Sequence, residues 1–181
     1  MKVPYIIASI ILAVALSSCS KNETTTTTTP GEGGNGSGIA ETVITKTAPE
    51  GAVSVVDARA QAKPGDAITV RGKVGGKINS ISDAAAILVL ADEKAITSCD
   101  DIHGDECPTP WDYCCEESSK IAASTATIQL RDGDGKIVRS TLRGLSGLKE
   151  LSHLVIAGTV DSTSTPEALI VNADKIHVEK P

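Results

Sequence analysis

Four of the chain's five cysteines lie close together, within residues 98–119. They are Cys99, Cys107, Cys114 and Cys115, and the last three belong to the segment CPTPWDYCC. Grouped thiols commonly form disulfides, bind a soft metal ion or carry out thiol redox chemistry. Residues 98–119 are therefore the part of the sequence best equipped for chemistry.

Disulfides are the first expectation for this group. Four cysteines allow three pairings. Neighbouring Cα atoms are about 3.8 Å apart, whereas a disulfide prefers about 4.4–6.8 Å, so Cys114 and Cys115 are not expected to bond to each other. One of them should bond Cys99 and the other Cys107, and the sequence leaves open which bonds which. Two such bonds would staple the segment into a compact knob without any cofactor.

A metal site is the alternative use of the same residues. The four thiols, His103 and the nearby carboxylates are suitable ligands for zinc or copper. A thiol redox enzyme built on Cys114 and Cys115 is the weakest hypothesis, because the sequence has no CxxC motif. Residues 98–119 also contain no Lys or Arg that would lower a thiol pKa, and the surrounding acids should raise it.

The same segment holds unusual aromatic residues and charge. Trp111 is the only tryptophan, Tyr113 is one of two tyrosines, and phenylalanine is absent. Held between Pro110 and Cys114, both rings are predicted to be rigid anchors of a binding surface. Residues 98–119 carry seven acids and no Lys or Arg, so their formal charge is −7. This equals the net charge of the whole chain from Cys19 onward. We therefore expect an acidic loop that recognises a protein or a small ligand.

Several other functions are disfavoured by the sequence. A net charge of −6 and the scarcity of aromatic residues argue against nucleic-acid binding. No Ser-His-Asp spacing, phosphate-binding loop or HExxH motif is present, so no enzyme is predicted. His153 and His177 stand alone and are interpreted as structural. The sequence Asp-Gly-Asp-Gly at 132–135 is predicted to be a hairpin turn and not a calcium loop.

The first 18 residues are typical of a signal peptide. The apolar run at 5–16 is too short to span a bilayer. Residues 16–19, Leu-Ser-Ser-Cys, resemble a bacterial lipobox, which implies cleavage before Cys19 and attachment of diacylglycerol and a further acyl chain such as palmitate there. Serine at position 20 favours the outer membrane under the sorting rule of proteobacterial lipoproteins. A signal peptide without lipidation is the alternative.

A tether and one folded domain are predicted to follow the signal peptide. Residues 19–38 comprise the lipidated cysteine, six threonines and a Gly-rich stretch without apolar residues, which predicts disorder. The folded domain should then occupy residues 39–181. Its periodicity predicts a helix at 52–62, strands at 67–74, 85–91, 126–131, 154–161 and 168–178, a return of the chain at 136–142, and a short helix at 145–151.

The order of these elements resembles an OB-fold, over residues 67–178. We expect an all-β barrel of about five antiparallel strands with one or two short helices, interrupted at 98–119 by the Cys-rich insert. Gly72 and Gly158 occupy the same place in two similar strand sequences, where they would let strands coil or bulge. A small β-sandwich is the alternative fold.

Uncharacterised bacterial lipoproteins combine a similar glycine-containing strand with a CPTPWDYCC segment, and this resemblance implies no activity. Together the features predict a lipid-anchored, non-catalytic protein of the bacterial cell envelope that binds through a disulfide-stapled acidic loop. An envelope protein that binds zinc or copper is the alternative.

Overall fold

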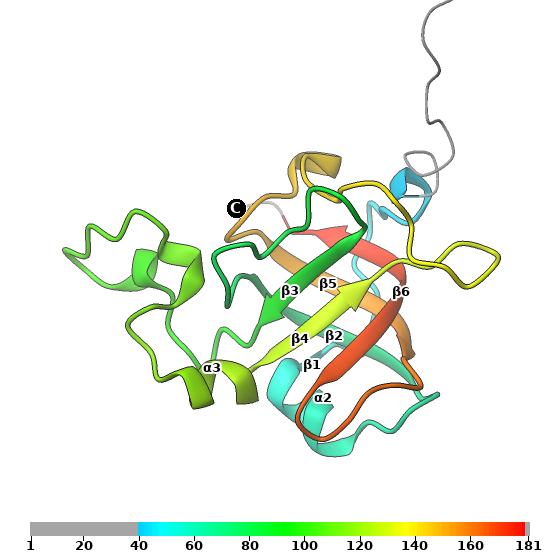
Figure 1. Ribbon diagram of the computed structural model, residues 1–181, viewed down its shortest axis with the longest axis horizontal. Coiled ribbons are helices and arrows are strands. Elements are labelled where there is room, and N and C mark those ends of the chain that lie inside the picture. Colours follow the sequence, from blue (N-terminus) through cyan, green and yellow to red (C-terminus); the bar gives the residue numbers. More distant parts are fainter. Residues whose placement is uncertain (1–39, 180–181) are drawn as a thin grey trace, which may run out of the picture. The chain divides into compact units, whose positions relative to one another are not determined.

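Five strands close into a barrel in the computed structural model, which describes residues 40–179 (Figure 1). The strands are β2 (Ala67–Val74), β3 (Ile87–Ala91), β4 (Thr125–Gln129), β5 (His153–Val160) and β6 (Leu169–Val178). Their order around the barrel is β2-β3-β4-β6-β5, and pairing between β5 and β2 closes it. The prediction of a small OB-like all-β barrel is confirmed.

One pair of barrel strands is parallel, so the expectation of a wholly antiparallel barrel is wrong. β4 and β6 run in the same direction, with Ala126 opposite Leu169, whereas the other four neighbouring pairs are antiparallel. A closed ring with an odd number of strands cannot alternate direction all the way round. The parallel pair is therefore a consequence of closing five strands.

The interior of the barrel is filled by alternate residues of each strand. In β2, Val70 and Val74 are fully buried while Arg71 faces outward. Successive strand side chains point to opposite faces, which is why the alternating pattern predicted the bounds of β2 correctly. The buried core residues of the other strands include Leu88, Leu90, Ile128, Leu154, Ile156, Val171 and Ile176.

A short helix, α2 (Val55–Gln61), follows a two-residue strand, β1 (Val53–Ser54). The helix was expected to span residues 52–62. The structure starts it later, because Val53 and Ser54 form β1 and pair with β2 in parallel, with Val53 opposite Val70. β3 pairs with β2 only at Lys73 and Val74, so β1 occupies part of the edge of β2 that β3 leaves. Ser54 caps the helix by accepting a hydrogen bond from the backbone N–H of Asp57 at 3.2 Å.

The two strand glycines allow backbones to approach closely. A Cβ at Gly158 would overlap the carbonyl oxygen of Asn172, and a Cβ at Gly72 would overlap that of Ala91. The register shift between β5 and β6 occurs at Ala157 and Gly158. A coil or bulge was expected at both glycines; the bulge lies at Gly158, whereas the pairing of β2 with β5 continues through Gly72 without a register shift.

The crossing between β4 and β5 is less regular than predicted. Residues 136–142 form no strand; an isolated bridge joins Ile137 to Arg131, and Val138 makes single backbone hydrogen bonds with Leu130 and Ala86. The turn before them is tight, since Asp132 accepts a backbone hydrogen bond from Gly135 at 2.9 Å. The helix expected at 145–151 is a single 3₁₀ turn, η3 (Leu145–Gly147), because Ser146, Gly147 and Leu151 have positive φ angles that interrupt a helical backbone.

The signal peptide predicted at 1–18, the lipidation predicted at Cys19 and the tether predicted at 19–38 all lie outside the described residues. Within residues 40–179, no helix has the length and apolar character needed to cross a membrane.

Candidate metal centre

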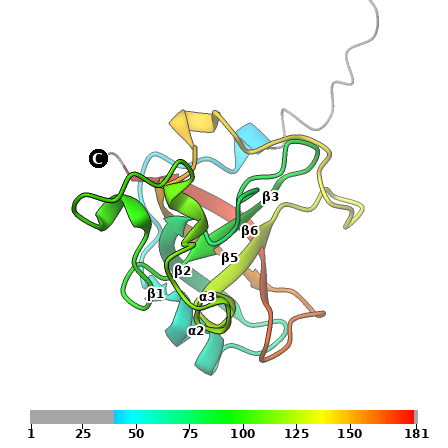
Figure 2. The same ribbon diagram turned by 60° about the vertical axis from the view of Figure 1, so that its left-hand side comes forward.

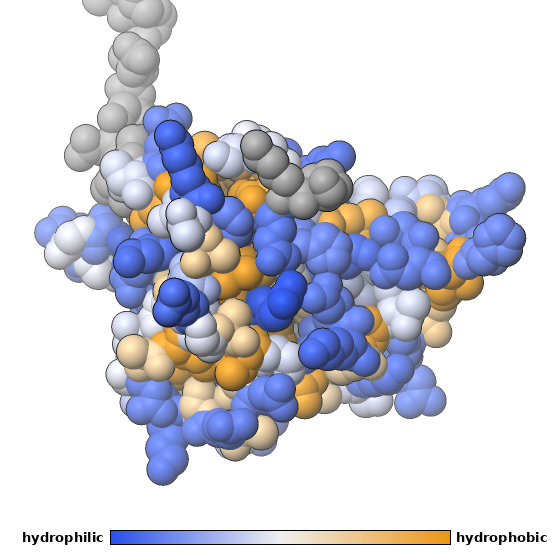
Figure 3. Space-filling model, turned by 180° about the vertical axis from the view of Figure 1, so that it is seen from behind, coloured by the Kyte–Doolittle hydropathy of each residue, from blue (hydrophilic) through white to orange (hydrophobic). Residues whose placement is uncertain are grey.

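The Cys-rich segment belongs to a long insert, residues 92–124, between β3 and β4. Figures 1 and 2 show it projecting from the side of the barrel. It contains two 3₁₀ turns, η1 (Cys99–Asp101) and η2 (Pro110–Asp112), and one helix that was not predicted, α3 (Ser118–Ala123). In the view from behind, the outer end of this projection is mainly hydrophilic (Figure 3).

Lys73 of β2 ties the start of the insert to the barrel. Its ammonium donates to Ser98 and to Asp101, each at 2.8 Å, and lies 3.2 Å from Asp100. The strand pattern places Lys73 on the outer face, yet its side chain is only 5% exposed because the insert covers it. A buried ammonium group is stable only when it is paired with carboxylates. Because Asp100 and Asp101 belong to η1, their ion pairs with Lys73 hold η1, including Cys99, against the barrel.

Tyr113 is the second attachment of the insert, and its predicted role as a surface anchor is wrong. The side chain is fully buried against Ala91 and Ile96, and burial raises the pKa of its hydroxyl. Gly75 provides the space, since a Cβ there would lie 2.6 Å from the Tyr113 ring. The ring therefore packs the insert onto the barrel and is not available to a partner.

Trp111 makes the third attachment through polar atoms. Its indole N–H donates to the carbonyl of Ile78 at 2.9 Å, and its own carbonyl accepts from the N–H of Gly76 at 2.8 Å. The side chain is only partly exposed. The concentration of aromatic residues in CPTPWDYCC is thus explained by docking onto the β2–β3 connection.

The docked insert brings all four thiols together. Cys114 Sγ lies 3.5 Å from Cys107 Sγ and 3.7 Å from Cys99 Sγ. Cys99 Sγ also lies 3.6 Å from Cys115 Sγ. In the structure these four residues are unbonded thiols. The predicted grouping of the cysteines is confirmed, whereas their bonding stays a prediction.

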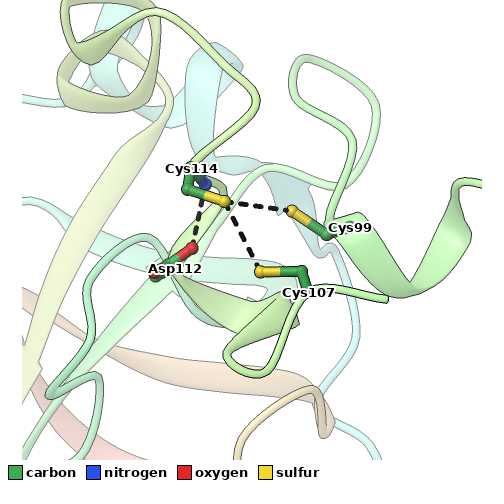
Figure 4. A group of neighbouring side chains, drawn as sticks. All are labelled: Cys99, Cys107, Asp112 and Cys114. Atoms are coloured by element: carbon green, nitrogen blue, oxygen red, sulfur yellow. Dashed lines mark hydrogen bonds between the residues drawn. The ribbon is translucent and has the colours of Figure 1, made fainter. Parts of the chain in front are cut away.

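Two aspartates complete the group, and each holds the cysteine two residues after it. Asp105 accepts from the backbone N–H of Cys107 at 2.7 Å, and Asp112 accepts from that of Cys114 at 2.9 Å. Such Asp-x-Cys turns fix the local backbone, and the second carboxylate oxygen of Asp105 lies 3.5 Å from the sulfur of Cys115. Figure 4 shows the sulfurs of Cys99 and Cys107 turned toward that of Cys114, with the carboxylate of Asp112 beside the backbone nitrogen of Cys114.

Six side chains therefore form two overlapping sets of ligand atoms. In the first set, the sulfurs of Cys99, Cys107 and Cys114 and a carboxylate oxygen of Asp112 all lie within 4.8 Å of one another. The second set consists of Cys99, Asp105 and Cys115, whose ligand atoms also lie within 4.8 Å of one another. His103, which the sequence suggested as a ligand, belongs to neither set.

Hydrogen bonds distribute the acidity of the thiols unevenly. The backbone N–H of Thr109 and the thiol of Cys114 lower the pKa of Cys107. Contacts with Cys107 and Cys99 raise the pKa of Cys114, and contacts with Cys99 and Asp105 raise the pKa of Cys115 to about 11. The expectation that nearby acids raise thiol pKa values is therefore wrong for Cys107, where a backbone donor dominates.

The acids of the insert are mostly engaged rather than freely solvated. Asp100 and Asp101 pair with Lys73, and Asp105 and Asp112 hold cysteines, as described above. Glu116 pairs with Lys120 at 2.7 Å and accepts from the N–H of Thr97. The acidic composition thus serves mainly to shape the insert.

Comparisons with known proteins leave this geometry to be interpreted on its own: no family model, no curated protein and no solved structure matches the chain.

Sequence reasoning named the four cysteines and nearby carboxylates but did not single out Asp105 and Asp112. The repeated Asp-x-Cys spacing at 105–107 and 112–114 was the signal that could have identified them. Nothing in the local sequence marks Lys73 as buried, because the insert that covers it is distant in the chain.

Proposed function

We propose that this protein is a non-catalytic metal-binding module that holds a thiophilic divalent cation, zinc above all, at Cys99, Cys107, Cys114 and Asp112. The observation that carries the proposal is the convergence of these four ligand atoms within 4.8 Å of one another. Three thiolates and one carboxylate make a four-coordinate donor set of the kind zinc takes in proteins.

The sulfur separations support a metal centre. With Zn–S bonds of about 2.3 Å, the edge of a tetrahedron is about 3.8 Å. The Cys99–Cys114 and Cys107–Cys114 separations are 3.7 and 3.5 Å. A disulfide needs about 2.05 Å, so each pair would have to close by about 1.5 Å. The observed spacing fits a shared ion with little movement.

The donor set also favours zinc over copper. Copper(I) prefers sites made up of soft sulfur ligands, whereas zinc also binds well where a carboxylate oxygen completes a set of thiolates. Cys99 is buried and Cys114 is exposed, so the ion would be held firmly on one side and reachable on the other. This arrangement suits capture and exchange of the ion, and the acidic insert would attract cations to it.

Metal content is the direct test of this proposal. A full-length Cys19→Ala chain, purified in mild detergent without chelator and under reducing conditions, is expected to contain zinc. The Cys107→Ser variant is expected to lose the ion of the first set, because a thiolate ligand is gone. The exposed turn variant Asp134→Asn is the matched control and should keep its zinc content. A chain whose four thiols are free and that takes up no zinc would refute the metal proposal.

A disulfide-stapled binding module is the second candidate, and one observation favours it. Cys99–Cys115 at 3.6 Å and Cys107–Cys114 at 3.5 Å together use every cysteine once. Among the pairings that the sequence leaves open, these distances favour Cys99 with Cys115 and Cys107 with Cys114. Such a module would present the acidic insert, without Tyr113, to a protein or small ligand. Peptide mapping without reduction would find these two links in place of metal.

We place the module at the bacterial envelope, held to the membrane by lipid on Cys19, with the outer membrane favoured. The proposal rests on the lipobox-like sequence at 16–19. One acyl chain binds a bilayer marginally, whereas two or three anchor a protein stably. Nucleic acid is not a proposed partner, because the charge is unfavourable.

Replacing Cys19 with alanine is therefore expected to abolish lipid attachment and to leave unprocessed or unacylated protein. Detergent partitioning and intact mass measure the outcome. The Cys107→Ser variant, which removes a thiol elsewhere, should keep the acyl mass. Mature wild-type protein that begins at Cys19 without acyl mass would contradict the anchor.

A further inference from the structure

One thiol of the cluster, Cys115, has no place among the four ligands proposed above. It lies 3.6 Å from Cys99 Sγ and 3.5 Å from the Oδ2 atom of Asp105. Cys99, Asp105 and Cys115 thus form a compact group of their own within 4.8 Å. Three convergent donors of this kind are what a second thiophilic ion requires.

Cys99 belongs to both groups, and this sharing connects them. A thiolate sulfur has three lone pairs and can bind two metal ions at once. We propose that the insert holds a pair of zinc ions bridged by the thiolate of Cys99, the second ion being bound by Cys99, Asp105 and Cys115; this inference rests on the proposed function of the first site.

The charges of the cluster support two ions rather than one. When ionised, the four thiolates and two carboxylates carry six negative charges, and a single Zn²⁺ offsets only two of them. A second Zn²⁺ would replace the proton between Cys115 and the Oδ2 atom of Asp105. The two ions would leave two net negative charges on a partly exposed cluster.

The second ion would differ from the first in its coordination. The first set supplies four protein ligands, whereas the second supplies three. A zinc site with three protein ligands keeps one position for water or an external ligand. Cys115 and Asp105 are both exposed, so this position faces solvent. The second ion, with one protein ligand fewer, would thus exchange more readily than the first and could accept a small anion or a thiol from solution.

Zinc stoichiometry tests this inference. The reduced full-length Cys19→Ala chain, titrated with Zn²⁺ and examined by native mass spectrometry, is expected to bind two ions. In the same background, Cys115→Ser and Asp105→Asn should each bind one ion, and Cys99→Ser should lose the bridged pair. Glu106→Gln, an exposed neighbour of Asp105, is the matched control and should still bind two.

The possible outcomes separate this inference from the proposed function. One ion in the parent chain would overturn the second site and leave the first standing. Two ions in the Cys115→Ser variant would also overturn it, because the second ion would then lie elsewhere. No ion at all would overturn both proposals. Retention of one ion by Cys115→Ser shows that its insert is folded, so loss of the second ion cannot be attributed to misfolding.

Discussion

Oxidation of the four clustered thiols is expected to release all bound zinc from the insert. Each sulfur can serve as a metal ligand or as half of a disulfide, but an oxidised sulfur is a poor ligand. Bonds between Cys99 and Cys115 and between Cys107 and Cys114 would consume every thiolate of both sets. Asp105 and Asp112 alone would then remain, and two carboxylates give weak zinc binding.

The experiment treats the reduced, zinc-loaded Cys19→Ala chain with an excess of a small disulfide. Each protein disulfide forms as two protein thiols give up two protons and two electrons, and the reagent is reduced to two thiols. A chromogenic chelator follows the released zinc, and peptide mapping identifies the links. Buffer without the disulfide is the control, and reduction should restore binding. Zinc retained after all four thiols are oxidised would contradict the expectation.

Alanine at Gly158 is expected to lower the free energy of unfolding by more than about 4 kcal/mol, an exceptionally large effect for one methyl group. The added Cβ would overlap the carbonyl oxygen of Asn172 and lie 2.9 Å from its carbonyl carbon. Both atoms belong to the backbone of β6, which pairs with β4 as well as β5. They cannot move aside without opening the barrel.

Urea unfolding followed by circular dichroism measures this loss. Gly133→Ala is the matched control, because nothing lies within 4 Å of a Cβ at that turn position. Neither glycine has a positive φ angle, so backbone conformation does not distinguish the two variants. If Gly158→Ala is expressed only as insoluble protein while Gly133→Ala stays soluble, the loss of stability is even larger than expected. Equal unfolding midpoints for the two variants would show that the sheet tolerates a side chain there.

The strands of the barrel were predictable because each is a local pattern. The alternation in residues 67–74 reflects burial of one face, and the bounds of β2 follow from it. The parallel pairing of β4 with β6 is not local, since it depends on how the ring closes. Residues 136–142 carry apolar residues that reach the core from an irregular segment, so their composition suggested more regularity than they have.

The candidate site was predictable in its composition and not in its geometry. Cys99 was expected to join the other cysteines, and it does. Tyr113 was expected on a binding surface, as a ring held rigidly between Pro110 and Cys114, yet it fills a space left by Gly75, far away in the chain. Burial is a property of the assembled fold, and a short sequence window does not report it.

The way β1 lies along β2 limits how another protein could bind this one. An exposed sheet edge offers unpaired backbone groups to which an extended chain can add as a further strand. Closure of the ring removes most of that edge, and Val53 and Ser54 occupy part of the stretch of β2 that β3 leaves. Among the described residues this arrangement leaves less strand edge to which an extended chain could add, so we expect copies of this protein to resist edge-to-edge polymerisation.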